Sequence, residues 1–388
     1  MSIPRDDLNQ TMAAADQALA ERKVVEARAI LEAAATQNPA VPAYWQRLAT
    51  VRQLSGAHGL ALAAIDKALE FGPLDFVNLL LRARMLDQSG HGEAGEAYGR
   101  ALAQRRPDPL PPALRSAVER AEAAWAEHQA GLERRLSVAL EAGNHDLTLA
   151  ERNRAERLAS NISRRTRTYH SEATHFHYPG LRELEFHDRG LFPWLDRVEA
   201  MTDVIAAELD QVANAPGADL VPYVQYAASE PLAQWRTLNH NRDWTAIHLI
   251  QRGNRIAANA ENCPQTMALL ADLPQPWIGG CGANAMFSLL APHTGIPPHV
   301  GVANFRLLCH VPLVVPGRCW FRVGEQVRHW ERGAAWVFDD SIEHEAMNET
   351  DALRVIMIFD IWHPDLSPAE QAAIATMVSA ASIPVGAL

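Results

Sequence analysis

The sequence predicts an α+β protein built from an N-terminal array of paired helices and a C-terminal antiparallel β-sandwich or barrel. Three observations support this prediction: a repeat of 33 or 34 residues in the first third, short strand-like runs after about residue 280, and a length of 388 residues, which suits two domains. Apolar residues make up 48% of the chain and charged residues 21%, which is typical of a soluble globular protein with a sizeable core.

Three segments of the first third repeat one pattern of small and large apolar residues followed by a proline: "EARAILEAAATQNP", "LALAAIDKALEFGP" and "EAGEAYGRALAQRRP". Small residues let two helices approach closely, a larger apolar residue fills the seam, and the proline ends the second helix of each pair. The aligned positions are Ala27, Ala61 and Ala94; Leu31, Ile65 and Tyr98; Ala34, Ala68 and Ala101; and Pro39, Pro73 and Pro107.

This spacing resembles a tetratricopeptide array of about two and a half repeats over residues 1–125, with a plain helical bundle as the alternative. Trp45 and Leu48 lie where the first helix of a repeat needs its packing residues. We expect a groove around Trp45, Leu48, Leu79 and Tyr98, and the usual role of such a groove is to hold a peptide or a partner protein.

Residues 126–175 keep apolar residues at three- and four-residue intervals among many charges, which predicts connecting helices. His170, His175 and His177 follow in "YHSEATHFHYPG". Three histidines suit a metal site, but no further ligand group follows at a useful spacing, so a loop packed on the domain face is favoured. A later amphipathic helix is predicted most clearly over residues 203–212.

The last hundred residues contain short runs rich in β-branched and aromatic residues: "NFRLLCHVPLVV", "CWFRVG", "QVRHW", "AAWVFDD" and "RVIMIFDIW". Turn signals such as "VPGR", "VGEQ", "ERGA" and "NETD" separate them, which predicts an antiparallel sandwich or barrel. Two sheets closed like a jelly roll leave an open mouth, where a metal and a small ligand can bind.

Several polar residues interrupt these apolar runs. His299 precedes one strand, His310 lies inside it, and His344 follows "VFDDSIE". Two neutral imidazoles suit a metal such as Fe(II), but position 301, where a His-x-Asp motif carries its carboxylate, is a glycine. Each histidine also fits a purely structural role within a strand.

Arg354 opens the strand "RVIMIFD", ten residues after His344. Residues that flank a hairpin turn lie close together, so we expect these two to share one end of the barrel. A buried arginine can clamp a carboxylate, which together with a metal indicates a keto-acid cosubstrate; an ion-pair partner is the alternative. Asp339 and Asp340 can form a turn or hold His344 as hydrogen-bond acceptors.

Residues from about 175 to 370 resemble the aspartyl/asparaginyl β-hydroxylase family. The resemblance runs through "MFSLLAPHTGIPPHVGVANFRLLCHVPL", "CWFRVG" and "WERGAAWVFDDSIEHEAMNETDALRVIMIFDIWHPDL", and upstream through "FHYPGL", "FPWL", "DWTAIHLIQRG" and "NCPQT". It implies a cupin-like double-stranded β-helix domain over residues 176–388. It also implies a dioxygenase that uses Fe(II), 2-oxoglutarate and O2. Tetratricopeptide repeats precede the catalytic domain in animal members as well.

The resemblance also implies a set of site residues. It implies that His299 and His344 bind the iron and that Gly301 stands in place of the usual carboxylate ligand. It implies that Ser288 and Arg354 hold the distal carboxylate of 2-oxoglutarate and that His310 contacts its metal-side carboxylate. Arg306 matches an arginine that lies toward the substrate.

This sequence departs from the animal members at three positions. Leu308 replaces a second arginine on the metal-side carboxylate, which removes one cationic contact to the cosubstrate. Asn239 and Ala246 stand where the animal enzymes place an arginine and a glutamine on the peptide substrate. The differences argue against the animal substrate, an Asp or Asn in an epidermal-growth-factor-like domain.

Three functions fit the sequence: an Asp/Asn β-hydroxylase whose repeats grip a polypeptide substrate, which is favoured; a hydroxylase of a small molecule or lipid acyl chain; and an inactive repeat-based scaffold. The net charge of −11 argues against a nucleic-acid binder, and four widely spaced cysteines predict reduced core thiols. The N-terminus has no signal-peptide pattern, and no apolar run approaches the roughly 18 residues of a membrane span, so we expect a cytoplasmic protein.

Overall fold

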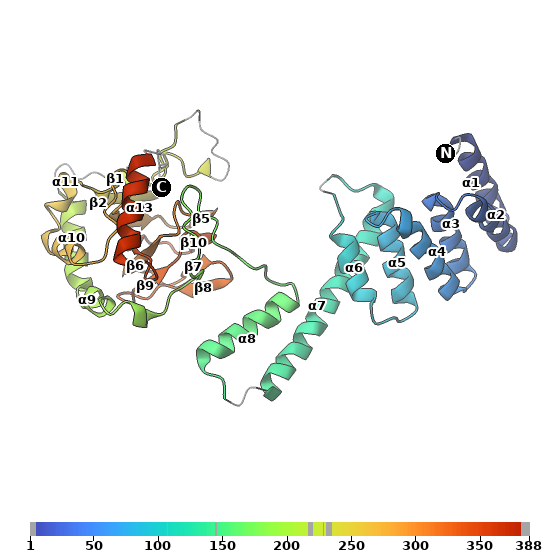
Figure 1. Ribbon diagram of the computed structural model, residues 1–388, viewed down its shortest axis with the longest axis horizontal. Coiled ribbons are helices and arrows are strands. Elements are labelled where there is room, and N and C mark those ends of the chain that lie inside the picture. The colour runs from blue at the N-terminus through green and yellow to red at the C-terminus, as the bar shows by residue number, and fades with distance from the viewer. Residues whose placement is uncertain are drawn as a thin grey trace. The chain divides into compact units, whose positions relative to one another are not determined.

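The computed structural model describes residues 5–381, apart from residues 107, 144–145, 216–219, 228 and 230–234. The chain forms two compact units, Met1–Thr166 and Arg167–Leu388 (Figure 1). The first unit is helical and the second is built on two β-sheets, which confirms the predicted fold class. No helix within the described residues is both long and apolar enough to cross a lipid bilayer.

Antiparallel helix pairs make up most of the first unit. Helix α1 contacts α2, α3 contacts α4, and α5 contacts α6. The small residues of the sequence repeat lie in these seams, where Ala27, Ala61 and Ala101 are fully buried. The helices are α1 (Arg5–Ala20), α2 (Val24–Gln37), α3 (Pro42–Leu54), α4 (His58–Phe71), α5 (Phe76–Gln88), α6 (Ala94–Leu102), the short 3-10 helix η1 (Pro112–Leu114), α7 (Arg115–Gly143) and α8 (Leu149–Ile162).

The repeat prolines follow the helix ends as predicted where they are described. Pro39 comes after α2 and Pro73 after α4, whereas Pro107 lies outside the described residues. The predicted groove needs correction: Leu48 and Tyr98 are only 1% and 5% exposed, so they fill the helical core instead of lining a surface.

The boundary predicted at residue 125 falls inside α7, a continuous helix of 29 residues. The predicted connecting helices therefore belong to the first unit. Gln129 on α7 donates to the carbonyl oxygen of Ser163 at 3.0 Å, which ties α7 to the end of α8. The second unit begins at Arg167 and not at residue 176.

The second unit contains two antiparallel sheets. Within the described residues, the larger sheet has the strand order β1-β2-β4-β11-β6-β9 with β3 paired to β2, and the smaller sheet has the order β5-β10-β7-β8. The strands are β1 (Leu220–Pro222), β2 (Trp244–Gln251), β3 (Asn254–Arg255), β4 (Ala285–Leu290), β5 (Thr294–His299), β6 (Arg306–Val314), β7 (Cys319–Val323), β8 (Gln326–His329), β9 (Trp336–Phe338), β10 (His344–Asn348) and β11 (Arg354–Trp362). The helices are η2 (Arg189–Leu191), α9 (Leu195–Ala200), α10 (Thr202–Ala213), α11 (Ala257–Ala260), α12 (Pro264–Ala271) and α13 (Pro368–Ala381).

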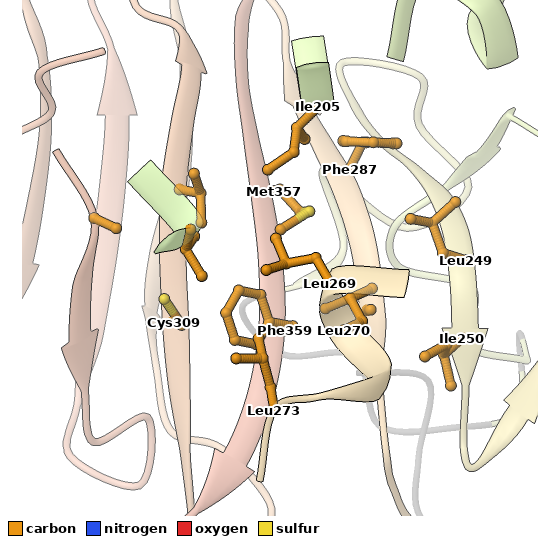
Figure 2. Close-up of a cluster of buried hydrophobic side chains, with 14 of the residues drawn as sticks. Ile205, Leu249, Ile250, Leu269, Leu270, Leu273, Phe287, Cys309, Met357 and Phe359 are labelled. Carbon is orange, nitrogen blue, oxygen red and sulfur yellow. The ribbon is translucent and has the colours of Figure 1, made fainter. Parts of the chain in front are cut away.

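The two faces of the larger sheet have different partners because side chains alternate along each strand. One face packs against helices α10 and α12 in a cluster that contains Ile205, Leu269, Phe287 and Met357 (Figure 2). The opposite face turns toward the smaller sheet and contributes Ile356 to a second cluster. Polar residues at alternate positions of β4, β6 and β11 therefore face the space between the sheets.

The expected hairpin between His344 and Arg354 is wrong. Strands β10 and β11 are consecutive in the chain but belong to different sheets. The connection joins Asn348 to Arg354, while His344 begins β10 at its far end. The two side chains nevertheless line one cavity, because the two sheets face each other across it.

All four cysteines are free and buried, as the sequence predicts.

Candidate active site

A cavity of about 100 Å³ lies between the two sheets of the second unit. The smaller sheet contributes its histidines from β5 and β10, and the larger sheet contributes polar residues from β4, β6 and β11. All the site residues expected from the sequence line this one cavity: His299, His344, Gly301, Ser288, Arg306, His310 and Arg354.

His299 and His344 are direct partners across the β5–β10 pair, and their ring centroids lie 4.0 Å apart. Nδ1 of His299 lies 2.8 Å from the carbonyl oxygen of Pro297, and Nδ1 of His344 lies 3.0 Å from that of Ile342. A carbonyl oxygen only accepts, so each Nδ1 carries the proton and each Nε2 keeps its lone pair. Carbonyl contacts of this kind fix ring orientation in metal sites.

Both imidazoles are neutral near pH 7. Burial lowers the pKa of His344 to about 4, and burial together with the neighbouring His344 lowers the pKa of His299 well below its ordinary value. Neutral imidazole is the form that binds a divalent metal. The two residues therefore suit a pair of Fe(II) ligands, because both rings have the required tautomer, both are neutral, and they lie close together.

Gly301 leaves space that a carboxylate from another strand segment fills. A Cβ atom at this position would lie 2.1 Å from Oδ2 of Asp340, because the Gly301 N–H donates to the Asp340 carbonyl oxygen at 2.6 Å and holds the two backbones together. Within the described residues, no group of three or more His, Cys, Asp or Glu side chains is placed to hold a metal ion. A metal here would be held by the two histidines together with ligands other than the His, Cys, Asp and Glu side chains that the structure describes.

Asp340 forms a buried ion pair with Arg306, in which Nη2 of Arg306 donates to Oδ2 at 3.0 Å. Each partner keeps one unsatisfied buried atom, Nε of Arg306 and Oδ1 of Asp340. Asp360 also favours the charged form of Arg306 electrostatically, and its Oδ2 accepts a hydrogen bond from Asn284. Burial raises the pKa of Asp360 to about 6. Of the two roles expected for Asp339 and Asp340, Asp339 forms the turn, where its Oδ1 accepts from the backbone N–H and the hydroxyl of Ser341. Nδ1 of His344 contacts the carbonyl oxygen of Ile342 and not an aspartate carboxylate.

Arg354 lies in a different electrostatic environment from Arg306. It is 1% exposed, its Nε has no hydrogen-bond partner, and its Nη1 reaches only the Ser288 carbonyl oxygen at 3.5 Å. No carboxylate of the described residues pairs with it, and burial lowers its pKa to about 10. A buried guanidinium without a counter-ion is a site for an anion, and its planar fork suits a carboxylate. These features fit the expected anchor for the distal carboxylate of 2-oxoglutarate.

His310 points into the same cavity from β6. Its Nδ1 is buried and has no partner, and its ring packs against Phe321 and Phe338 at centroid distances of 4.9 and 4.6 Å. Burial, with the Arg354 charge nearby, lowers the pKa of His310 well below its ordinary value. An unsatisfied imidazole between the histidine pair and Arg354 can take a polar ligand group.

The structure assigns two tryptophans to the cavity that the sequence reasoning did not select. The guanidinium of Arg354 lies over the Trp330 ring, 4.9 Å from its centroid, and the indole N–H of Trp244 donates to Oγ of Ser288 at 3.0 Å. Trp244 begins β2 and Trp330 follows β8, and a tryptophan in or beside a strand is equally typical of a core residue, so the sequence did not distinguish them.

The positions where this chain departs from the animal enzymes have local structural roles. The side chain of Asn239 accepts from the backbone N–H of Tyr226 and donates to its carbonyl oxygen, while Ala246 is fully buried in β2. His170, His175 and His177 do not form a metal-ligand group with other described residues, and His170 contacts Glu183 at 3.2 Å.

A second cavity of about 370 Å³ adjoins the first on the side of β2. The two cavities share four lining residues, Tyr223, His248, Gln251 and Arg252. Gln251 and Arg252 lie at the β2–β3 turn, at the end of β2 opposite the one nearest Arg354.

The family model for aspartyl/asparaginyl β-hydroxylase matches residues 199–364, which include every residue of the predicted site. The chain is 32% identical over 202 residues to an ornithine lipid ester-linked acyl 2-hydroxylase of Rhizobium tropici, covering 51% of this chain and 68% of that protein. It is 34% identical over 142 residues to the human aspartyl/asparaginyl β-hydroxylase, covering 36% of this chain and 18% of that protein. The chain spans only 18% to 39% of the length of the animal relatives that it matches.

Among solved structures, the chain is similar to the type III secretion chaperone SycD of Yersinia enterocolitica in complex with a peptide of the translocator YopD. The TM-score is 0.30 and the identity 17%, covering 34% of this chain and 98% of that chain.

Proposed function

The chain belongs to the aspartyl/asparaginyl β-hydroxylase family, and we propose that it is an Fe(II)- and 2-oxoglutarate-dependent dioxygenase that hydroxylates the β-carbon of an Asp- or Asn-type residue in a protein or peptide. The family is one of hydroxylases; the metal, the cosubstrate and the substrate are our proposal. One observation carries it: two neutral, oriented imidazoles share one cavity with a buried arginine that has no carboxylate counter-ion among the described residues.

Each residue of the cavity has a distinct task in this proposal. His299 and His344 bind the iron through Nε2, and Arg354 with Ser288 holds the distal carboxylate of 2-oxoglutarate. His310 contacts the metal-side carboxylate. Bound iron supplies the chemistry that couples reduction of O2 to oxidation of 2-oxoglutarate and of a substrate C–H bond.

The protein environment restricts what can reach the reacting atoms. The aromatic rings of Phe321, Phe338 and Trp330 surround His310 and exclude water from that side of the cavity. Arg306, fixed by Asp340, faces the cavity and is placed to orient a polar group of the substrate. The substrate enters from the side of β2, where the second cavity adjoins the first.

A second candidate is a hydroxylase of a lipid acyl chain or another small molecule. Two observations favour it. The relative that this chain covers to 68% is named as an acyl 2-hydroxylase. The residues at the peptide-contact positions of the animal enzymes, Asn239 and Ala246, are here a backbone-bonded side chain and a buried methyl group.

The helical unit and the location of the protein enter as further proposals. We propose that the repeats hold a polypeptide substrate or a partner protein and that the protein acts in the cytoplasm. Under the acyl-chain alternative the repeats serve assembly instead.

The deciding experiment measures conversion of 2-oxoglutarate to succinate by the full chain with Fe(II), followed by mass spectrometry of candidate peptides and lipid extracts for the gain of one oxygen. Succinate formation that depends on both Fe(II) and 2-oxoglutarate supports the reaction class. Its absence in a folded, iron-loaded protein leaves the inactive scaffold as the better description.

A further inference from the structure

The hydrogen bond between Trp244 and Ser288 has a known direction. An indole N–H is only a donor, so Nε1 of Trp244 donates and Oγ of Ser288 accepts, at 3.0 Å. The Ser288 hydroxyl keeps its own proton, and no acceptor for that proton is found among the described residues. Because Ser288 is 1% exposed, the proton can be satisfied only by something that enters the cavity.

The strand register explains how this contact arises. Ala246 of β2 stands directly opposite Ser288 of β4, and Trp244 lies two residues further along the same face of β2. A methyl group opposite Ser288 leaves room for the indole to reach across the diagonal, a distance that aromatic side chains can span. A longer side chain at position 246 would occupy the same space.

The indole is held rigidly in this position. Its ring stacks on Tyr223 with centroids 3.8 Å apart and planes 8° apart, and it is 4% exposed. The ring of Trp235 packs against the Trp244 ring with centroids 6.0 Å apart, and against the His299 ring with centroids 4.9 Å apart. A rigid donor fixes the rotation of an otherwise freely rotating hydroxyl, which prepares that hydroxyl to donate before any ligand arrives.

Ser288 and Arg354 therefore present two unsatisfied donors in one buried place, the hydroxyl O–H and the guanidinium Nε–H. They are close neighbours, because Nη1 of Arg354 reaches the Ser288 carbonyl oxygen. A carboxylate can accept from both donors at once.

We propose that Trp244 is a positioning residue for the dicarboxylate cosubstrate: its indole N–H orients the Ser288 hydroxyl toward the distal carboxylate that Arg354 neutralises. This inference rests on the proposed function. Trp244 acts through Ser288, so its effect is confined to ligands that have a distal carboxylate.

Calorimetry of the full chain with Mn(II) in place of Fe(II) tests this without turnover. Trp244→Phe removes the donor that orients the Ser288 hydroxyl, and loss of the hydrogen bond that this hydroxyl would donate to the charged carboxylate should weaken 2-oxoglutarate binding about tenfold. Oxalate, which chelates the metal but has no distal carboxylate, should bind wild type and variant equally. Trp277→Phe is the matched control, because Trp277 is 52% exposed and does not line the cavity.

A double-mutant cycle separates positioning from packing. Ser288→Ala should weaken 2-oxoglutarate binding to a similar extent, and adding Trp244→Phe should then change it by less than about twofold, because both changes remove the same contact. If Trp244→Phe unfolds the protein, 3-benzothienylalanine placed at position 244 keeps the ring and removes only the N–H donor.

The outcomes distinguish the inference from the proposed function. If wild type with Mn(II) does not bind 2-oxoglutarate, the proposed function fails and this inference fails with it. If wild type binds but the position-244 variants bind equally well, or if their effect adds fully to that of Ser288→Ala, the positioning role is overturned while the proposed function stands.

Discussion

Replacing Gly301 with alanine should destabilise the protein, because the added methyl group would overlap one partner of a buried ion pair. In Gly301→Ala the new Cβ would lie 2.1 Å from Oδ2 and 2.4 Å from Cγ of Asp340, far inside an ordinary contact. Asp340 is 3% exposed and bonded to Arg306, so its carboxylate must leave that partner or push the surrounding strands apart.

Two physical costs set the magnitude. Overpacking a core costs about 1–3 kcal/mol, and removing one partner from a buried ion pair costs about 3–5 kcal/mol. We expect Gly301→Ala to lower the free energy of unfolding by about 2–4 kcal/mol, which for a domain of roughly 200 residues lowers Tm by about 4–16 °C. Gly279→Ala is the matched control, because a Cβ there meets nothing within 4 Å.

The assay is thermal unfolding in Gly301→Ala, Asp340→Ala and the double variant. Asp340→Ala removes the three atoms that lie nearest to the new Cβ, so Gly301→Ala should cost less in that background. Gly301→Asp should also lose 2-oxoglutarate turnover, because a second carboxylate in this space displaces Asp340 before it can act as a ligand. A Gly301→Ala protein with wild-type Tm would refute the claim that Asp340 fills this position.

The other predictions concern the metal, the anchor, acid stability and the helical unit. His344→Ala should abolish iron-dependent turnover and retain the circular dichroism spectrum; retained turnover would contradict its assignment as a ligand. Arg354→Ala should raise the KM for 2-oxoglutarate by an amount that corresponds to about 2–5 kcal/mol, and Arg354→Lys by less, because lysine keeps the charge but not the fork; equal KM values in wild type and Arg354→Ala would rule out the anchor. Burial lowers the pKa of His187 from 6.5 to about 4, so its neutral form is required and stability should fall by about 3 kcal/mol as pH drops from 6.5 to 4; urea unfolding should show a shallower pH dependence in His187→Phe, whereas the exposed-site control His329→Gln should match wild type. A protein that begins at Arg167 should keep its KM for a small substrate and show a raised KM for a polypeptide held by the repeats, with iron binding as the check on folding.

Local patterns predicted the paired helices of the first unit and the strands after about residue 280, but not β1, β2 and β3. The spacing of 33 or 34 residues placed Ala27 and Ala61 in helix seams, and short runs of β-branched and aromatic residues placed His310 and Arg354 in or at the start of strands, because both signals are carried by local sequence. The pairing of strands was not predictable in the same way. The short connection between β10 and β11 suggested a hairpin, yet each strand buries a different face and joins a different sheet.

The site was predictable as a set of residues but not as an arrangement. The resemblance identified His299 and His344, whereas their relation to Asp340 depends on a backbone hydrogen bond between residues 301 and 340. The contact of Trp244 with Ser288 depends on the register of β2 against β4 and on the small side chain of Ala246. The spacing of these residues along the sequence indicates neither contact.

The charges of the cavity explain why Leu308 is compatible with the proposed chemistry. Arg306 is balanced by Asp340, so Arg354 is the cation that lacks a carboxylate partner among the described residues. Its pKa of about 10, against an ordinary 12.5, corresponds to about 3 kcal/mol of unfavourable burial in the empty site. A second arginine at position 308, which also lines the cavity, would add another uncompensated charge. With leucine there, no second arginine is added beside Arg354, and a single distal carboxylate can neutralise the Arg354 charge. 2-Oxoglutarate, which has a distal carboxylate, should therefore stabilise the folded, Mn(II)-loaded protein against heat more than oxalate does at equal occupancy, and Arg354→Ala should remove that difference.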